Sequence, residues 1–283
     1  MIKAILSLGM FIASLVPALG EVEYEIHAVY CDDTTPEFRE NILELRTYHA
    51  APGKLDALLT RFRDHTVNLF TKHGMTNVGY WVPVENSDNL LVYLMAYPSK
   101  DARDASWKTF MEDPEWKKAY AESTANGKLV EKVDQIFMTP TDFSKGFAKI
   151  APDAPSGKKG LHPAPAGNDH LFEMRTYTAT EGNLPDLHAR FRDHTLALFK
   201  KHGITNLGYF QFTPDQKGTE NTLLYFIAHK DADAAKKSWQ GFVADSDWVA
   251  AKKASEEKAG GSLTEKGGVK SVFLKPTDFS PVK

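Results

Sequence analysis

The stretch from Arg61 to Tyr80, RFRDHTVNLFTKHGMTNVGY, returns 129 positions later as Arg190 to Tyr209, RFRDHTLALFKKHGITNLGY. Fifteen of the twenty residues are identical, and most of the five differences exchange one apolar side chain for another. A self-match of this length indicates a tandem duplication, in which each half is a supersecondary unit that needs its neighbour to bury a sheet face. The repeat therefore predicts two domains in the 283 residues.

The repeated stretch contains most of a helix. From Lys54 to His73 apolar residues recur at intervals of three and four, which is typical of an amphipathic helix. These residues are Leu55, Leu58, Leu59, Phe62, Leu69 and Phe70. Gly74 follows as a C-terminal stop signal, and Gly203 takes the same place in the second copy.

Strands surround this helix in both copies. Ile42 to Tyr48 alternates, with apolar residues on one face and Glu44, Arg46 and Tyr48 on the other, and Leu171 to Tyr177 repeats the pattern. Further strands are predicted at Thr76 to Val84, Asn89 to Tyr97 and Val130 to Met138, with a helix capped by Ser99 and interrupted at Asp113-Pro114. Each half is therefore predicted to be a βαββαβ, ferredoxin-like unit of the α+β class.

Such a unit covers one sheet face with its helices and leaves the other face bare. We expect the face with Glu44 and Arg46 to be the bare one, packed on the other half as a pseudo-two-fold dimeric α+β barrel within one chain. Because a buried charge must be paired, we expect Arg46 to pair with Glu173 and Arg175 to pair with Glu44, across the pseudo-two-fold axis.

The chain begins with a predicted export signal. In residues 1–20, MIKAILSLGMFIASLVPALG, Lys3 precedes a short apolar run and small residues come before the expected cleavage point. The run is short for a membrane anchor, so the mature protein is expected to be periplasmic or secreted, without a stable anchor. The remaining segments are an arm (21–40), the first domain (41–144), a linker rich in Pro, Gly and Ala (145–169) and the second domain (170–280).

Composition and motifs exclude several classes of function. The net charge of −3 and the absence of a basic run argue against a nucleic-acid partner. Cys31 is the only cysteine, so no disulfide can form within the chain. No metal-binding motif, Gly-rich phosphate loop or G-x-S-x-G elbow is present, and no metal and no cofactor are expected from the residues alone.

His65 and His194 are the candidate catalytic residues. His65 is three positions after Phe62 and four before Leu69, on or beside the expected sheet-facing stripe. There an imidazole could be a general base, a haem ligand or a polar group bonded to a neighbouring strand. The candidate ligand-binding residues carry guanidinium, phenol or amide groups and are Arg46, Arg175, Tyr80, Tyr209, Asn77, Asn206, Tyr93 and Tyr225.

Several short motifs occur in the same order in both halves. The first half has ELRTY at 44–48, PG at 52–53, GYW at 79–81 and NLLVYLMAY at 89–97; the second has EMRTY, a single Gly182, GYF and NTLLYFIAH. In this order and spacing the motifs resemble the NIPSNAP family, over about residues 42–140 and 170–276. The resemblance implies the dimeric α+β barrel superfamily, which also holds cofactor-free monooxygenases, chlorite-dismutase-like haem proteins and small-molecule isomerases. NIPSNAP members themselves have no agreed chemical activity.

Three functions remain open at this point. The first is an exported barrel that binds a small apolar molecule or a protein partner. The second is a cofactor-free monooxygenase or isomerase that uses His65 or His194 with Tyr or Asn donors. The third is a haem protein with a helix-borne axial histidine.

Overall fold

The computed structural model describes residues 42–144 and 170–283, which belong to one compact unit. The predicted signal, the arm with Cys31 and the linker lie outside these residues. The first half consists of β1 (Ile42–Ala50), α1 (Leu55–Arg61), η2 (Phe62–Thr66), α2 (Val67–Lys72), β2 (Thr76–Pro83), β3 (Leu90–Tyr97), α3 (Lys100–Glu112), α4 (Pro114–Thr124) and β4 (Val130–Pro140). The second consists of β5 (Leu171–Ala179), α5 (Leu184–Arg190), η3 (Phe191–Thr195), α6 (Leu196–Lys201), β6 (Thr205–Phe212), β7 (Thr222–His229), α7 (Ala232–Ala244), α8 (Ser246–Lys258) and β8 (Thr264–Pro276).

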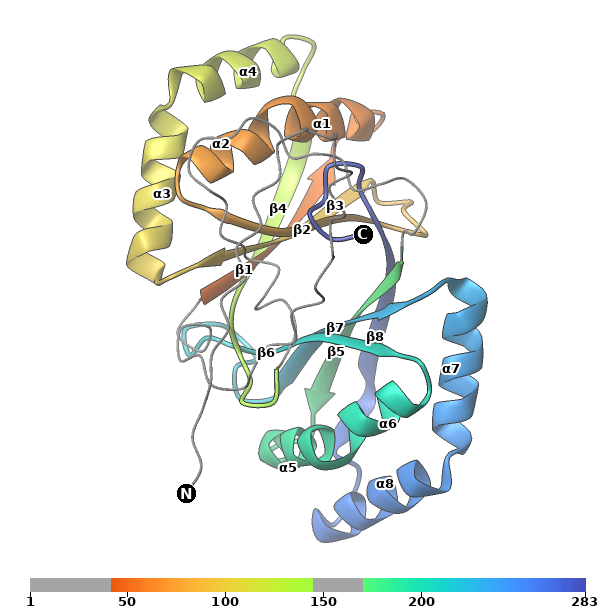
Figure 1. Cartoon of the computed structure of the whole chain (residues 1–283). Coiled ribbons are helices and arrows are strands. Elements are labelled where there is room, and N and C mark those ends of the chain that lie inside the picture. Colours follow the sequence, from red (N-terminus) through yellow and green to blue (C-terminus); the bar gives the residue numbers. More distant parts are fainter. Residues whose placement is uncertain (1–41, 145–169) are drawn as a thin grey trace, which may run out of the picture. The chain divides into compact units, whose positions relative to one another are not determined.

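The eight strands close into one barrel in the order β1-β3-β2-β8-β5-β7-β6-β4. The two halves meet where β2 pairs with β8, at Trp81 and Pro276, and where β4 pairs with β6, at Met138 and Phe212. Each half places its helices over its own four strands (Figure 1). The predicted α+β fold, two ferredoxin-like units in an intrachain pseudo-two-fold barrel, is confirmed.

The barrel interior is apolar. Its core is built from both halves and includes Leu43, Leu45, Trp81, Val92, Leu94, Met138, Phe172, Phe210, Leu224, Phe226 and Leu274. The prediction that the face with Glu44 and Arg46 lines the interior is therefore wrong, because Glu44 instead contacts Arg103 and Trp107 of α3. The narrow apolar core offers no partners to a charge, whereas the helices do.

A second layer of aromatic side chains lies between each sheet and its helices. In the first half Phe62 packs edge-on against Tyr93, and the rings of Tyr80 and Tyr93 stack with centroids 5.4 Å apart. Tyr209 and Tyr225 stack in the same way, at 5.1 Å. These rings bury large apolar areas and fix each helix against its sheet.

A single π-helical turn interrupts the first helix of each half. In the first half the Val67 amide donates to the carbonyl of Phe62, five residues earlier, and the Thr66 hydroxyl donates to the Arg61 carbonyl at 3.2 Å. The extra residue in this turn rotates the following side chains relative to a regular helix. Thr66 and Val67 are consequently buried, whereas His65 is exposed.

The PTDFS segments that follow β4 and β8 cross to the opposite half. Residues 140–144 bind β6, where the Thr141 amide donates to the Tyr209 carbonyl at 2.9 Å. Residues 276–280 bind β2, where the Thr277 amide donates to the Tyr80 carbonyl and the Tyr80 amide donates to the Ser280 hydroxyl. Each half is therefore completed by the tail of the other. None of the helices in the described part of the chain is long and apolar enough to cross a membrane.

Candidate functional site

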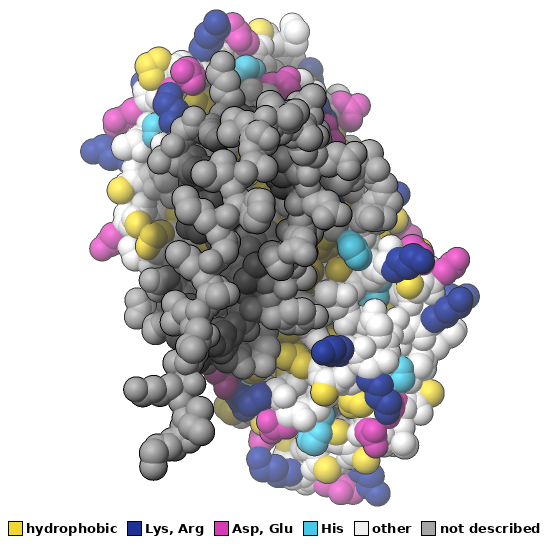
Figure 2. All heavy atoms as spheres, viewed as in Figure 1, with side chains coloured by type: hydrophobic (Ala, Val, Ile, Leu, Met, Phe, Trp, Pro, Cys, Tyr) yellow, Lys and Arg dark blue, Asp and Glu magenta, His cyan; other side chains and the backbone are white. Residues whose placement is uncertain are grey.

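Where Figure 2 draws side chains by type, no charge of one sign is concentrated. Basic and acidic side chains are interspersed over the visible helices at both ends of the molecule. Selective recognition of a ligand on this face would therefore depend on enclosed or grooved sites rather than on a field of one sign.

The first half contains a cavity of about 340 Å³ between its sheet and its helices. Its walls come from β1, α1, η2, α2, α3, α4 and β4 and are rich in aromatic residues, with four charged ones, Arg46, Arg61, Glu131 and Lys132. The aromatic lining consists of Tyr48, Phe62, Phe70, Trp107, Phe110, Trp116 and Tyr120. The volume is at the small end of the range for small-molecule pockets.

Arg46 extends from β1 into this helix–sheet layer. Its guanidinium lies 4.4 Å from the Trp107 ring centre and donates to Glu44 Oε1 at 2.6 Å and Gln135 Oε1 at 3.0 Å. Burial disfavours the charged form, but the electrostatic influence of Tyr93, Tyr48 and Glu44 outweighs it, so the pKa of Arg46 is raised. Arg46 is therefore a permanent cation at this site.

Glu44 is a fully buried carboxylate beside Arg46. It also accepts from Arg103, with Nε–Oε2 at 3.0 Å and Nη2–Oε1 at 2.8 Å, and from Trp107 Nε1 at 3.3 Å. Burial alone would raise the pKa of Glu44, but hydrogen bonds and charge from Arg103 and Arg46 give a net lowering. The carboxylate is thus held ionised between two arginines.

These contacts correct the predicted pairing across the pseudo-two-fold axis. Arg46 pairs with Glu44 of its own strand, and Arg175 pairs with Glu173 in the same way at 2.5 Å. Residues two apart on a strand point to the same face, so each pair forms locally on the side that faces the helices. The predicted need for a partner was right, and the predicted partners were wrong.

Arg61 is the second arginine of the cavity and has a different environment. It is only 5% exposed, and its guanidinium lies 5.3 Å from the Trp116 ring centre. Within residues 42–144 and 170–283 its side chain makes one long hydrogen bond, 3.3 Å to the Ser123 hydroxyl, and no carboxylate lies within ion-pair distance. Burial lowers the pKa of Arg61.

The duplicate of Arg61 has the counter-ion that Arg61 lacks. Arg190 donates to Ser255 at 3.4 Å, as Arg61 does to Ser123, but it also lies 3.7 Å from Glu256. Thr124 follows Ser123 where Glu256 follows Ser255. The buried positive charge of Arg61 therefore lacks a carboxylate partner among the described residues, whereas the equivalent charge in the second half is paired with Glu256.

A second unmatched polar group lies behind the cavity wall, next to Tyr48. Tyr93 lies under Tyr48, with ring centres 5.2 Å apart, and is fully buried. Its hydroxyl has no hydrogen-bond partner in the described residues, and burial raises its pKa well above the ordinary value. Tyr225 is the corresponding residue in the second half and has the same properties.

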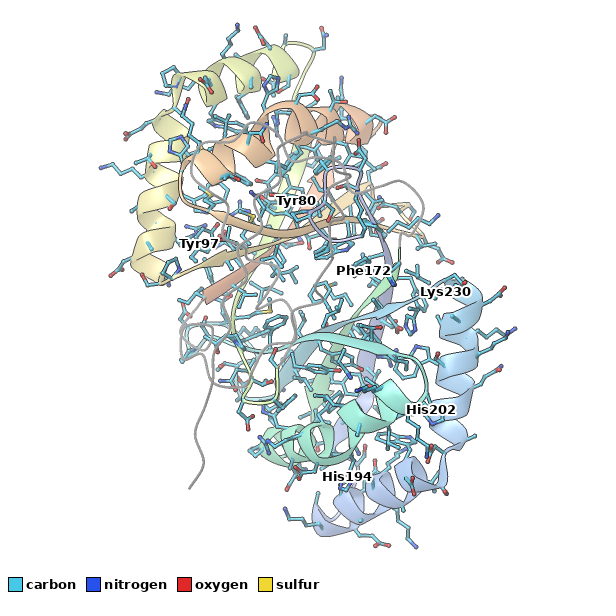
Figure 3. The ribbon with its side chains drawn as sticks, in the orientation of Figure 1. Tyr80, Tyr97, Phe172, His194, His202 and Lys230 are labelled. Carbon is cyan, nitrogen blue, oxygen red and sulfur yellow. The ribbon has the colours of Figure 1, made fainter. Side chains whose placement is uncertain are left out.

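Four of the predicted ligand-binding residues instead connect a strand to a helix. The Tyr80 hydroxyl donates to Asn77, whose amide donates to the Val67 carbonyl at 3.2 Å, just after the π-helical turn. Tyr209 and Asn206 repeat this arrangement at Leu196. Tyr80 is labelled in Figure 3, beneath the first helix. These placements favour a structural role for the four residues, and a binding role for them stays a prediction.

The predicted catalytic histidines lie outside the cavity. His65 and His194 are exposed, so their predicted place on the sheet-facing stripe is wrong, because the π-helical turn changes the helical phase. Figure 3 shows His194 near the end of α5 that faces α6. Arg61 precedes the turn and is buried on the same face of α1 as Leu58. In the described segments, no group of three or more His, Cys, Asp or Glu residues could hold a metal ion.

The fold and this cavity define the class of the protein before any comparison. It is a dimeric α+β barrel whose two protomer-like halves are joined in one chain, with a helix–sheet pocket in the first half. The chain belongs to the NIPSNAP family, whose model matches residues 43–145 and 172–281. Among proteins with curated functions, none matches this chain.

Solved structures match this chain over one half or over most of its length. An uncharacterized NIPSNAP domain protein from Burkholderia xenovorans is 24% identical and covers 36% of this chain and 96% of its own, with a TM-score of 0.32. A putative monooxygenase from Fusobacterium nucleatum is 12% identical over 84% of this chain and 93% of its own, with a TM-score of 0.50. An anthrone oxidase-like protein is 11% identical over 84% and 92%, with a TM-score of 0.51. At these identities the likeness concerns the fold.

Proposed function

We propose that the helix–sheet cavity of the first half binds a small aromatic molecule with an anionic oxygen, a carboxylate or a phenolate. The observation that carries this proposal is Arg61, a buried guanidinium without a carboxylate partner in the described residues. Its counterpart in the second half, Arg190, has such a partner in Glu256. A buried charge without a counter-ion costs several kcal/mol. A bound anion would provide that counter-ion through charge-assisted hydrogen bonds.

The walls of the cavity support the aromatic part of the ligand. Phe62, Trp107 and Trp116 present ring faces and edges to a space of about 340 Å³, which suits a compact aromatic acid or phenol. The unpaired Tyr93 hydroxyl beneath Tyr48 provides a further polar group behind the cavity wall. Orientation would come from the arginine and affinity from the rings.

Catalysis at the same site is the second candidate function. Two neighbours that cover most of the chain are described as a putative monooxygenase and an anthrone oxidase-like protein. A cofactor-independent oxygenase would take O₂, insert one oxygen atom into an activated CH₂ group to give a carbonyl, and release the other atom as water with the two substrate hydrogens. A cation beside the substrate would stabilise the enolate that reacts with O₂. No described histidine lines the cavity, so this reading does not depend on His65 or His194.

Calorimetry with 1-naphthoate and its neutral amide, 1-naphthamide, tests the binding proposal. We expect 1-naphthoate to bind, the amide to bind at least tenfold more weakly, and Arg61→Gln to remove this difference. Arg190→Gln is the matched control and should leave naphthoate affinity unchanged. Equal affinities for acid and amide, or an unaffected Arg61→Gln variant, would overturn the proposal. Oxygen uptake with an anthrone then separates an enzyme from a binding protein.

Export remains a further proposal, supported by residues 1–20 alone. N-terminal sequencing of the protein purified from its own source should begin near Glu21, and a retained Met1 would contradict it. A protein partner is the alternative to a small ligand, and two exposed apolar side chains at the cavity wall, Met111 (53%) and Tyr120 (49%), favour it. Co-purification of a second chain that Met111→Ser releases would support that reading.

A further inference from the structure

The second half has a groove of about 1050 Å³ between α7 and β8 that extends to the β2–β3 hairpin at Glu85. Ala232 and Ala235 of α7 line it, together with Trp239, Ser271 and Phe273. Lys230, labelled in Figure 3 where β7 leads into α7, lies at the same groove. This site is separate from the first-half cavity, with which it shares no lining residue.

The first half fills the equivalent space with two cationic side chains of its own. Arg103 of α3 lies 5.2 Å from the Trp107 ring centre and 5.3 Å from that of Phe137, and it forms the two-point contact with Glu44. Lys100 lies over the same Phe137 ring at 5.5 Å and pairs with Asp215 at 2.8 Å. The first copy therefore has a guanidinium between two aromatic rings and a carboxylate.

The second half keeps the two aromatic rings and the carboxylate but lacks counterparts of Arg103 and Lys100. Trp239, Phe273 and Glu173 correspond to Trp107, Phe137 and Glu44, while Ala235 and Ala232 stand where Arg103 and Lys100 stand in the first copy. The groove opens at these alanines. In the first copy the equivalent ring surfaces accommodate a guanidinium, that of Arg103.

In the second half His229 and Ser271 donate to the carboxylate in place of a second arginine, while the tryptophan donates in both halves. Glu173 accepts from His229 Nε2 at 2.9 Å, Ser271 Oγ at 2.6 Å and Trp239 Nε1 at 2.8 Å, besides Arg175. In the described part of the chain Glu173 is bonded to one arginine, Arg175, whereas Glu44 is bonded to two. The Ser271 hydroxyl lines the groove, so its lone pairs can accept a hydrogen bond from a ligand.

We propose that this groove binds a guanidino acid, a small molecule with a guanidinium at one end and a carboxylate at the other. The guanidinium would stack on Trp239 and Phe273, as Arg103 does in the first copy, where a planar cation over an aromatic face is favourable. Asp231 and Glu85 in the groove lining add acidic groups for it. Lys230, Lys236 and Lys275 line the same groove and would receive the carboxylate.

Arginine is the probe for this proposal, with two analogues that each lack one charge. Citrulline has the same length without the cation, and agmatine lacks the carboxylate. In calorimetric titrations of the mature protein, we expect one equivalent of arginine to bind and citrulline to bind at least tenfold more weakly. Agmatine should fall between them, because it keeps the stacking group and loses the contact with the lysines.

Ala235→Arg is the decisive variant. It gives the second half the side chain that the first half has, so it should fold with an unchanged far-ultraviolet circular dichroism spectrum and lose arginine binding. The reciprocal Arg103→Ala variant opens the equivalent space in the first half and should raise the stoichiometry towards two. Arginine affinity that is unchanged in Ala235→Arg, or equal to that of citrulline, would overturn the proposal.

The two binding sites can be tested separately. Arg61→Gln should leave arginine binding intact, and Ala235→Arg should leave naphthoate binding intact. A loss of both ligands in either variant would indicate misfolding and would be detected in the same preparation by its circular dichroism spectrum.

Discussion

Arg63 of the first helix and Asp278 of the C-terminal tail form a two-point ion pair, with Nε–Oδ2 at 2.5 Å and Nη2–Oδ1 at 2.8 Å, across 215 residues of sequence. Arg192 and Asp142 form its duplicate, with both contacts at 2.7 Å. Charge pairs between the halves therefore exist, but they join helices to tails and are not the strand-to-strand pairs that we predicted.

The tail ion pairs are exposed, so each contributes little free energy by itself. Asp278 is 61% exposed, and pairs of this kind typically contribute less than about 1 kcal/mol. We expect Asp278→Asn and Asp142→Asn each to lower the free energy of unfolding by that amount or less, as measured in urea. Phe279→Ala should cost more, about 2 kcal/mol, because its ring packs against Phe62 and Tyr80. If Asp278→Asn lowers the free energy of unfolding as much as Phe279→Ala does, the ion pair and not apolar packing holds the tail in place.

Removing the charge of Glu44 should destabilise the protein more than removing that of Glu173. Glu44→Gln leaves Arg46 and Arg103 without their shared carboxylate, and breaking a buried ion pair typically costs about 3–5 kcal/mol. Glu173→Gln leaves one arginine and three donors that tolerate a neutral acceptor. Urea unfolding of the two variants side by side measures the difference, and equal losses would contradict this reading of the two sites.

The pH dependence of stability should contain a contribution from Glu173. Burial by itself raises the pKa of this carboxyl, but His229, Arg175 and Ser271 hold it at about 2, well below its ordinary value. A carboxyl with a depressed pKa in the folded state stabilises the protein above its unfolded pKa, and this stability is lost as the pH falls toward the folded pKa. We expect a loss on the order of 3 kcal/mol between about pH 5 and pH 2 that Glu173→Gln removes. Unfolding free energies of both proteins across this range would show it as a difference in slope, and parallel curves would contradict it.

Supplying a carboxylate to Arg61 should block the first-half cavity. Thr124→Glu places an acid where Glu256 stands beside Arg190, so the variant should be as stable as the wild type or up to about 1 kcal/mol more stable. Its affinity for 1-naphthoate should fall at least tenfold, because the internal anion competes with the ligand. Glu256→Thr is the matched exchange, and it should leave naphthoate binding in the first half unchanged. If Thr124→Glu binds 1-naphthoate as tightly as the wild type does, Arg61 does not bind the ligand.

Much of the fold could be predicted because its signals are local. Ser99 accepts from the Ala102 amide at the start of α3, as expected of an N-cap, and Gly74 ends its helix with a φ of 76°. The repeat then required the halves to pair. The tail exchange could not be predicted in this way, because nothing in PTDFS indicates which half it binds.

The errors concern orientation within correctly predicted elements. Both faces of β1 are buried, so its alternation distinguishes two environments without saying which one faces the barrel interior. Likewise, RFRDHT gives no local sign of a π-helical turn, and one inserted residue turns the rest of a helix by about 100°. That turn leaves His65 exposed, whereas Arg61 precedes it and is buried on the Leu58 face of α1. The difference between Thr124 and Glu256 was visible in the repeat and was the available signal for the cavity.

The crossing of the two tails also bears on how such a chain could arise. An ancestral protein with one unit would have been an obligate homodimer, each subunit clasped by the other's C-terminal segment, with two identical sites. Fusion of two gene copies keeps the clasp and releases the sites from symmetry, since a mutation then changes one half alone. Thr124 against Glu256, and Arg103 against Ala235, are substitutions of this kind, and they make the charges around equivalent positions of the two halves different.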